Sequence, residues 1–268
     1  MPLTFPSHLA PVLPLKLWRP RWFDGVALAT GAVAPDVGYL FAGTRLDLGS
    51  RTHSLAGLLW WCLPVALGYS WLVRRTVAGI AAHLPGERIF GWRRYAALRG
   101  VRHPWPIIVC SALLGAASHL GWDWLTHTDR WLRLVGIEDF HAATGIHWWS
   151  FSDLISTIVG AAVVVALAVR AGRRHERVDG VPPSAPPARP ARFWAVALAV
   201  TAVGAALLAG LPAAAMPAPG LVRLLHLAAV ALIAGAWASA GLAVGGRVAG
   251  GRALGRSDHL IEEQRHVG

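Results

Sequence analysis

Charge is scarce in this sequence. Asp, Glu, Lys and Arg make up 15% of its 268 residues, whereas about a quarter of an ordinary soluble domain is charged. Lysine is nearly absent, since Lys16 is the only one, and hydrophobic residues make up 55% of the chain. The shortage of charge therefore argues against a soluble globular domain.

Cysteine is also rare, which argues against a disulfide-bonded fold and against a metal site made of cysteines. Cys62 and Cys110 both fall inside apolar runs, and their spacing fits neither a disulfide framework nor a thiolate metal site. We expect both to be ordinary packing residues. A basic leading segment is missing as well, because the chain starts with MPLTFPSHLAPVLP, so no cleaved signal peptide is expected.

Long apolar runs, by contrast, are abundant. Five of them approach the length of about 20 residues that crosses a bilayer, and a sixth, weaker run covers 24–43. Inside lipid the backbone must satisfy its hydrogen bonds within the chain, so these runs are expected to be helices. The sequence predicts an all-α, polytopic membrane helical bundle with about six hydrophobic helices. The five stronger runs are 55–73, 107–126, 151–171, 193–211 and 221–244.

The formal net charge of +11 suggests a nucleic-acid partner, but the arginines are distributed as in a membrane protein. They gather in 74–106, in 172–192 and in the C-terminal tail, whereas 127–150 has more acids than arginines and 212–220 has no charge. By the positive-inside rule the basic segments face the cytoplasm, and 44–54, 127–150 and 212–220 face outward. We therefore expect the lipid bilayer as partner and no nucleic acid.

The chain divides into three parts by composition. Residues 1–171 hold almost every histidine and acid near a span and are expected to form a membrane-embedded domain with a metal site. Residues 172–192 form a cytoplasmic linker rich in Pro and Arg, and 193–268 a transmembrane hairpin with a basic tail. Abundant Ala, Arg and Gly with little Lys is typical of GC-rich bacterial genomes, so we expect a multi-pass protein of the bacterial inner (cytoplasmic) membrane.

The stretch ASHLGWDWLTH, at the end of an apolar run, carries His119, Asp123 and His127 at intervals of four. In a helix such residues share one face and rise about 6 Å per step. His119 and Asp123 can therefore hold one ion together. His127 lies about 12 Å from His119 along the axis, so it would serve a second metal ion or act as an acid or base at the rim.

The predicted topology brings other polar residues to the same side. His53 precedes the span that starts at 55, and Asp36 lies late in the 24–43 run, where Pro35 and Gly38 interrupt the helix. Both are expected in the outer half of the membrane, at the depth of 119–127. Ionisable groups at this depth cost about 2.5–3.5 kcal/mol each, which indicates a function.

His8 can be placed in two ways. Residues 8–18 could form a short half-helix that brings His8 to the outer side, or the N-terminus could stay cytoplasmic and far from the other residues. The first placement is preferred.

Other polar residues near the spans have plainer interpretations. His226 is expected to be a hydrogen-bonded packing residue, and His83 and His103 ordinary surface residues of a basic segment. His141 and His147 could bind substrate or support the ligands, and Asp153 is a weaker candidate. For the main cluster itself, the alternatives are an interhelical hydrogen-bond network or a haem site, although the carboxylates argue against haem.

Four stretches in this order carry a resemblance to known families: FPSHLA, GAVAPD, THSLAGLL and SHLGWDWLTH. The sequence resembles the DUF4184 family of uncharacterised bacterial membrane proteins. More distantly, its order of His, Pro-Asp, His-Ser and His-x-x-x-Asp is similar to that of membrane-bound metal-dependent hydrolases of the YdjM type and of the helical zinc-dependent phospholipase C family. The resemblance covers roughly residues 1–160.

In the phospholipase-like group the matching histidines and aspartates ligate zinc ions. The resemblance therefore implies five metal ligands here, which are His8, Asp36, His53, His119 and Asp123. The soluble enzymes carry a further His-x-x-x-Glu pair, which this sequence lacks, so one or two ions are expected rather than three.

These features favour a membrane-embedded metal-dependent hydrolase. Zn²⁺ is the expected ion for nitrogen and oxygen ligands, with Mn²⁺ or Fe as alternatives. Asp36 would bridge ions or orient water as a base, and His127 would act as the acid or base at the rim. A lipid-linked phosphoester or another amphiphile is the expected substrate. The alternative is a non-catalytic integral membrane protein with a metal-binding, transport or structural role; the oligomeric state stays open.

Overall fold

Five long helices match the five stronger apolar runs. The computed structural model describes residues 7–174, 189–211 and 218–240, and these contain helices and no strand. Each long helix has the length and composition to cross a membrane, so the chain is a multi-pass, all-α membrane protein, as predicted. The five are Leu55–Ala81, Trp105–His127 (α6), Trp148–Arg174 (α8), Pro190–Ala209 (α9) and Ala218–Ala240.

The first long helix is not uniform. It begins as α3 (Leu55–Gly57), continues through a π-helical turn at Leu58–Cys62, and becomes α4 (Leu63–Ala81). The side chain of Ser54 caps its start by accepting a hydrogen bond from the N–H of Gly57 at 3.0 Å. The predicted linker lies mostly outside the described residues, and so does the basic tail.

The weaker run at 24–43 differs from the prediction of a sixth span. It contains α2 (Gly25–Val33) and a 3₁₀ helix, Pro35–Phe41, each far shorter than the about 20 residues that a span needs. The break follows from Pro35, which occupies the first position of the second helix, where its missing N–H costs nothing. The N-terminal segment likewise contains a 3₁₀ helix, Ser7–Leu9, followed by α1 (Leu13–Trp18).

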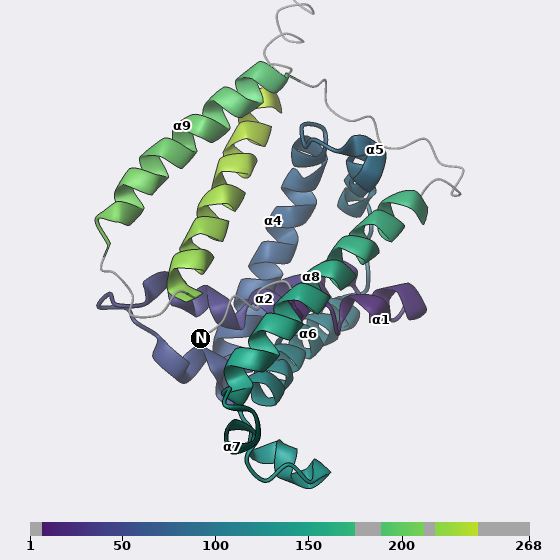
Figure 1. Cartoon of the computed structure of the whole chain (residues 1–268). Helices are drawn as coiled ribbons and strands as arrows, with labels where there is room; N and C mark the ends of the chain where they lie inside the picture. Colours follow the sequence, from purple (N-terminus) through teal and green to yellow (C-terminus); the bar gives the residue numbers. More distant parts are fainter. Residues whose placement is uncertain (1–6, 175–188, 212–217, 241–268) are drawn as a thin grey trace, which may run out of the picture.

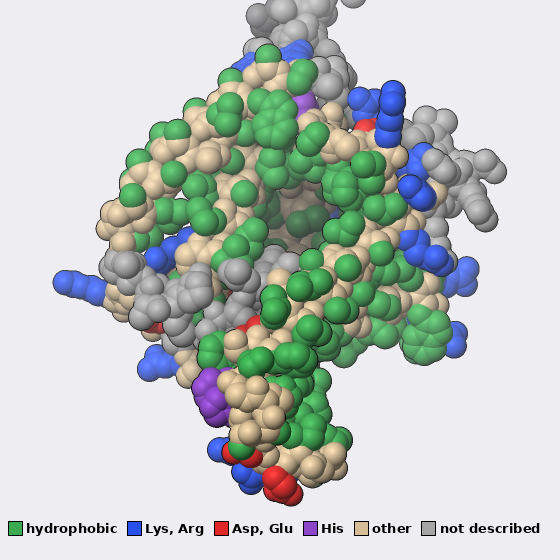
Figure 2. Space-filling model, viewed as in Figure 1, with side chains coloured by type: hydrophobic (Ala, Val, Ile, Leu, Met, Phe, Trp, Pro, Cys, Tyr) green, Lys and Arg blue, Asp and Glu red, His purple; other side chains and the backbone are tan. Residues whose placement is uncertain are grey.

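The long helices run between two ends of the molecule. In Figure 1, α4, α8, α9 and the helix Ala218–Ala240 connect the upper and lower ends, and α1 and α2 lie across them. The short helix α5 (Glu87–Phe90) lies at the upper end and α7 (Phe140–Thr144) at the lower end. The basic segment that contains α5 and the arginine-poor segment that contains α7 therefore lie at opposite ends. Figure 2 shows hydrophobic side chains over the surfaces of α8 and α9, as expected for helices that face lipid.

Helices α2 and α6 pack backbone against backbone. A Cβ atom at Gly31 would lie 2.1 Å from the carbonyl oxygen of Ala112, and one at Gly115 would lie 2.3 Å from that of Leu28. Neither position accepts a side chain unless the helices move apart. The buried core around them consists mainly of alanines, as in other close helix pairs in membranes.

Asp24 fixes the start of α2. Its Oδ1 accepts hydrogen bonds from the N–H groups of Val26 and Ala27 at 3.0 and 2.9 Å, and its Oδ2 pairs with Nη2 of Arg74 at 2.5 Å. The carboxylate is only 1% exposed, so a helix cap and an ion pair together compensate its burial. This pair ties α2 to α4.

Two polar contacts attach the last helix to the N-terminal part. Nδ1 of His226 donates to the carbonyl of Val222, so Nε2 accepts from the Tyr69 hydroxyl at 2.7 Å. Arg223, which is buried, donates to the carbonyls of Leu40 and Ala42. His226 is thus a hydrogen-bonded packing residue, as expected.

His83 differs from its predicted place on the surface. It is 8% exposed, its ring stacks on Phe193 with 4.3 Å between centroids, and its Nε2 accepts a hydrogen bond from the N–H of Arg189. The prediction is wrong because the basic sequence around His83 does not reveal that the start of α9 packs on the end of α4.

We predict that Gly115→Ala destabilises the protein, because the added methyl group must push α2 away from α6. Strain of this kind costs about 1–3 kcal/mol. The measurement is the midpoint of thermal unfolding in detergent, which should fall. Gly121→Ala on the same helix is the matched control, since a Cβ atom there meets nothing within 4 Å. An equal midpoint for both variants would contradict the close packing.

Candidate metal centre

Five histidine and aspartate side chains meet where four segments of the chain converge. His8 lies on the first 3₁₀ helix and Asp36 on the 3₁₀ helix after α2. His53 ends another 3₁₀ helix, Gly49–His53, directly before the first long helix. His119 and Asp123 lie one turn apart on α6. The structure thus brings together all five residues that the resemblance implies, including His8, whose placement the sequence left open.

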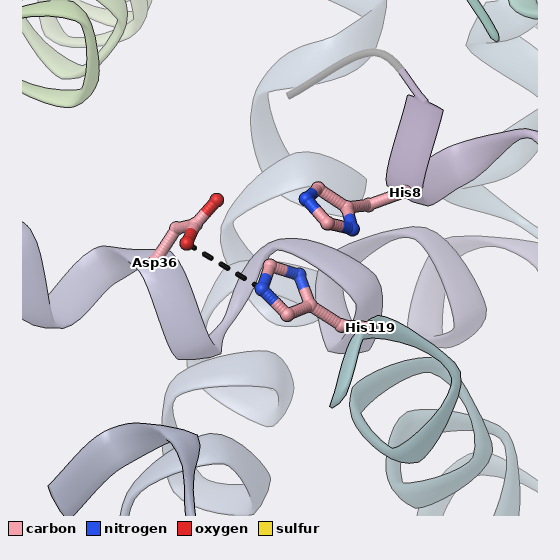
Figure 3. A group of neighbouring side chains, drawn as sticks. All are labelled: His8, Asp36 and His119. Atoms are coloured by element: carbon pink, nitrogen blue, oxygen red, sulfur yellow. Dashed lines mark ion pairs between the residues drawn. The ribbon is translucent and has the colours of Figure 1, made fainter. Parts of the chain in front are cut away.

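His119 is at the centre of this cluster. Its Nε2 lies 3.4 Å from Oδ1 of Asp36 and 3.3 Å from Oδ2 of Asp123, and its ring stacks on that of His8 with 3.8 Å between centroids. Figure 3 shows His8, Asp36 and His119 converging, with one oxygen of Asp36 directed at His119 and the other turned away.

The distances from His53 and His8 to the two aspartates complete the description of the cluster. Nε2 of His53 lies 3.2 Å from Oδ1 of Asp36 and 3.8 Å from Oδ2 of Asp123. Nε2 of His8 lies 3.6 Å from Oδ1 of Asp123. These five His–Asp distances all fall between 3.2 and 3.8 Å, and four of them join different segments of the chain.

A backbone hydrogen bond sets the orientation of His119. Its Nδ1 donates to the carbonyl oxygen of Ala32 on α2 at 2.7 Å, which directs Nε2 into the cluster. That Nε2 is fully buried and has no hydrogen-bond partner among the described residues. A neutral ring would direct its lone pair at two carboxylate oxygens, which repel it unless a cation lies between them, whereas an imidazolium ring would direct its Nε2–H at both.

His53 is oriented by a side chain. Its Nδ1 lies 3.0 Å from Oγ1 of Thr52, which is 1% exposed, and its Nε2 donates a hydrogen bond to Oδ1 of Asp36 at 3.2 Å. Nδ1 therefore accepts from the Thr52 hydroxyl in this arrangement. An ion at Nε2 would need the other tautomer, in which Nδ1 donates to Thr52, and ligating histidines typically donate their second ring nitrogen to such a partner. Thr52 can thus support His53 as a ligand.

Burial and neighbouring charges affect the charge states of His8 and Asp36, the two clustered residues on short helices before the first long helix. Burial, and next the neighbouring His119, lower the pKa of His8 to about 3, so its imidazole is neutral. Burial alone would raise the pKa of Asp36, but the adjacent imidazoles of His119 and His53 bring it well below the usual range of a carboxyl group. A neutral imidazole and an ionised carboxylate are the forms that bind metal ions.

The ligand spacing fits a small divalent cation. Ligands at about 2.0–2.2 Å from a tetrahedral ion lie about 3.3–3.6 Å from each other. Two sets of three have ligand atoms within 4.8 Å of one another, His8 with Asp36 and His119, and His53 with His119 and Asp123. Both sets use Nε2 of His119, and one nitrogen lone pair binds only one ion. The two sets therefore describe either a single ion, or two ions of which the second is held mainly by carboxylate oxygens.

His127 extends the cluster toward α8. Its Nδ1 lies 3.5 Å from Oδ1 of Asp123 and its Nε2 lies 3.4 Å from Oδ1 of Asp153. The Asp153 side chain is 8% exposed, and neither of its oxygens has a hydrogen-bond partner in the described part of the chain. His127 therefore stands beside the five clustered residues rather than among them, as its position on α6 predicts.

The outer histidines are not part of this group. His141 and His147 are exposed and stack on each other with 4.1 Å between centroids.

The sequence did not predict that Thr52 and the carbonyl of Ala32 contact the clustered histidines, and it indicated Asp153 only as a weaker candidate. The Thr-His dipeptide was a usable signal for Thr52, whereas no sequence pattern indicates a backbone carbonyl as partner.

Comparison with known proteins adds one finding. The family model described as a domain of unknown function, DUF4184, matches residues 1–244. No curated protein and no solved structure matches the chain.

Proposed function

The chain belongs to the DUF4184 family, a domain of unknown function, and from this premise we propose that its cluster of histidines and aspartates is the metal centre of a membrane-embedded hydrolase. One observation carries the metal part of the proposal: Nε2 of the buried His119 lies 3.3 and 3.4 Å from oxygens of two carboxylates, while its Nδ1 donates to the carbonyl of Ala32. Positive charge at Nε2 is needed to hold two carboxylates there, and a bound cation supplies it.

His119, His53, His8, Asp36 and Asp123 would hold the ion. With nitrogen and oxygen ligands, Zn²⁺ is the first candidate, followed by Mn²⁺ or Fe. A bound divalent ion supplies Lewis-acid chemistry, since it polarises a phosphoryl oxygen and lowers the pKa of water from about 15.7 toward about 7.

The protein's own groups would supply the proton transfers. The oxygen of Asp36 that points away from His119 would accept the proton of the attacking water and orient it. His127 would donate a proton to the leaving oxygen. It is 22% exposed at the edge of the cluster, and its second ring nitrogen faces Asp153.

The position of the site suggests the substrate class. The cluster lies among helices that span the membrane, on the half that the arginine distribution predicts to face outward. A lipid-linked phosphoester or another amphiphile reaches this depth within the bilayer itself. The resemblance of the four motifs to zinc-dependent phospholipases supports the same class. The alternative, a metal-binding protein without catalysis, uses the same ligands and differs only in turnover.

We predict that protein purified in detergent contains one or two equivalents of zinc or manganese, and that the double variant His119→Ala/Asp123→Ala contains none. Elemental mass spectrometry gives the metal content. His226→Ala is the control, because this histidine lies on a spanning helix but bonds only to Tyr69 and Val222 among the described residues. Protein that stays metal-free after incubation with excess zinc would rule out the metal centre.

We predict that the metal-loaded protein hydrolyses a phosphodiester such as bis(p-nitrophenyl) phosphate or a short-chain phospholipid. On the phospholipid, whose leaving alkoxide needs a proton, His127→Gln should keep the metal but lower turnover about 100-fold, as expected for loss of a general acid. Release of the alcohol is the readout, with metal content measured on the same samples. A loaded wild type that cleaves none of these esters would favour the non-catalytic alternative.

We predict that Thr52→Val weakens metal binding about 10- to 100-fold, because it removes the hydroxyl that orients His53. A competition titration with a chelating dye measures the affinity. Thr76→Val is the matched control: Thr76 is equally buried, but its hydroxyl donates to the carbonyl of Leu72 on α4. Equal affinities for the two variants would show that Thr52 does not orient a ligand.

A further inference from the structure

A second feature lies away from the metal centre, at the other end of α4. A cavity of about 540 Å³ opens between α4, α6 and the segment that joins them. Half of its lining residues are arginines, Arg74, Arg75, Arg99 and Arg102, and the others include His103 and Trp71. None of these residues touches the His and Asp cluster in any contact described above.

Most of this positive charge is uncompensated. Arg74 is neutralised by Asp24 and also donates to the carbonyl of Val101 at 2.9 Å. Arg75, Arg99 and Arg102 are exposed, and within residues 7–174, 189–211 and 218–240 no carboxylate lies within ion-pair distance of them. Three exposed guanidinium groups therefore surround one that is held in place.

A further cation lies beside the cavity. Nζ of Lys16 lies 3.0 Å from Nε2 of His103 and donates to the carbonyls of Pro20 and Phe23. Burial, and next this ammonium group, lower the pKa of His103, so the imidazole accepts the hydrogen bond from Lys16. The cavity wall thus also carries the field of Lys16, whose neighbouring acid, Asp24, is already paired with Arg74.

The depth of the cavity corresponds to a lipid headgroup layer. Arg75 follows Leu55, the first residue of its span, by 20 positions, which is about 30 Å of helix and the thickness of the hydrocarbon core. Trp71 and Trp105 are 56% and 63% exposed near it, as is typical of aromatic residues at a membrane interface. The Arg75 guanidinium lies 4.9 Å over the Trp71 ring.

We propose that this cavity binds a phosphate-bearing anion at the membrane surface that the arginine distribution predicts to be cytoplasmic. Arginine forks match phosphate oxygens in pairs, and basic pockets between spanning helices on this side bind the headgroups of anionic lipids. The ligand is an anionic phospholipid headgroup or a soluble phosphate compound, which share the same chemistry. The positive-inside rule explains why arginines occur on this side, but it does not require them to line one cavity.

The test uses the full chain in nanodiscs and has two arms. In the first, native mass spectrometry counts the phosphatidylglycerol retained from discs of equal phosphatidylglycerol and phosphatidylcholine. In the second, calorimetry measures binding of sodium pyrophosphate to protein in phosphatidylcholine discs. The variant is Arg75→Gln/Arg99→Gln/Arg102→Gln, which leaves the Arg74–Asp24 pair intact. The control is Arg45→Gln/Arg130→Gln/Arg133→Gln, three exposed arginines in other segments.

We expect saturable binding in one arm, weakened about tenfold to a hundredfold in the cavity variant and unchanged in the control. Retained phosphatidylglycerol identifies a lipid headgroup, and bound pyrophosphate identifies a soluble ligand. Absence of saturable binding in both arms, or equal binding by the two triple variants, would overturn the proposal. Neither arm depends on the metal content, so failure of the metal centre leaves this test unaffected.

Discussion

The hydrogen bond from Nδ1 of His119 to the carbonyl of Ala32 is the interaction on which the site depends. It requires α2 and α6 to be in backbone contact, which Gly31 and Gly115 permit because neither carries a Cβ atom. With that contact in place, the end of α2 delivers Asp36 to the same point. One close helix crossing thus positions the central histidine and its first carboxylate together, and the other ligands join from segments that pack around it.

The sequence predicted the elements whose signal is local. Apolar runs located the five long helices, with ends shifted by up to eight residues where Arg74, Arg75 and their neighbours continue α4 beyond the apolar run. The His-x-x-x-Asp spacing placed His119 and Asp123 on one face of α6. The weaker run at 24–43 was harder, because its hydropathy resembles a span while Pro35 divides it into short helices.

Partners that meet only in the folded chain could not be predicted in this way. Nothing near Asp153 in sequence shows that it faces His127 across two helices, and nothing near His83 shows that Phe193 covers it. The arginines of the cavity were predicted to lie on the cytoplasmic side. That they converge on one cavity depends on how the segment after α5 folds back along α4. The motifs therefore identified the five clustered residues, whereas the groups that orient them required the structure.

Arg223 has a consequence for how the chain assembles in the membrane. Its guanidinium is buried in the helix Ala218–Ala240 and donates to carbonyls that belong to the residues just after Asp36. Alone in lipid, this helix would carry a cation without partners, at a cost that grows with depth. Docking onto the N-terminal half satisfies this guanidinium, which favours an order of assembly in which that half forms first and the last helix docks onto it.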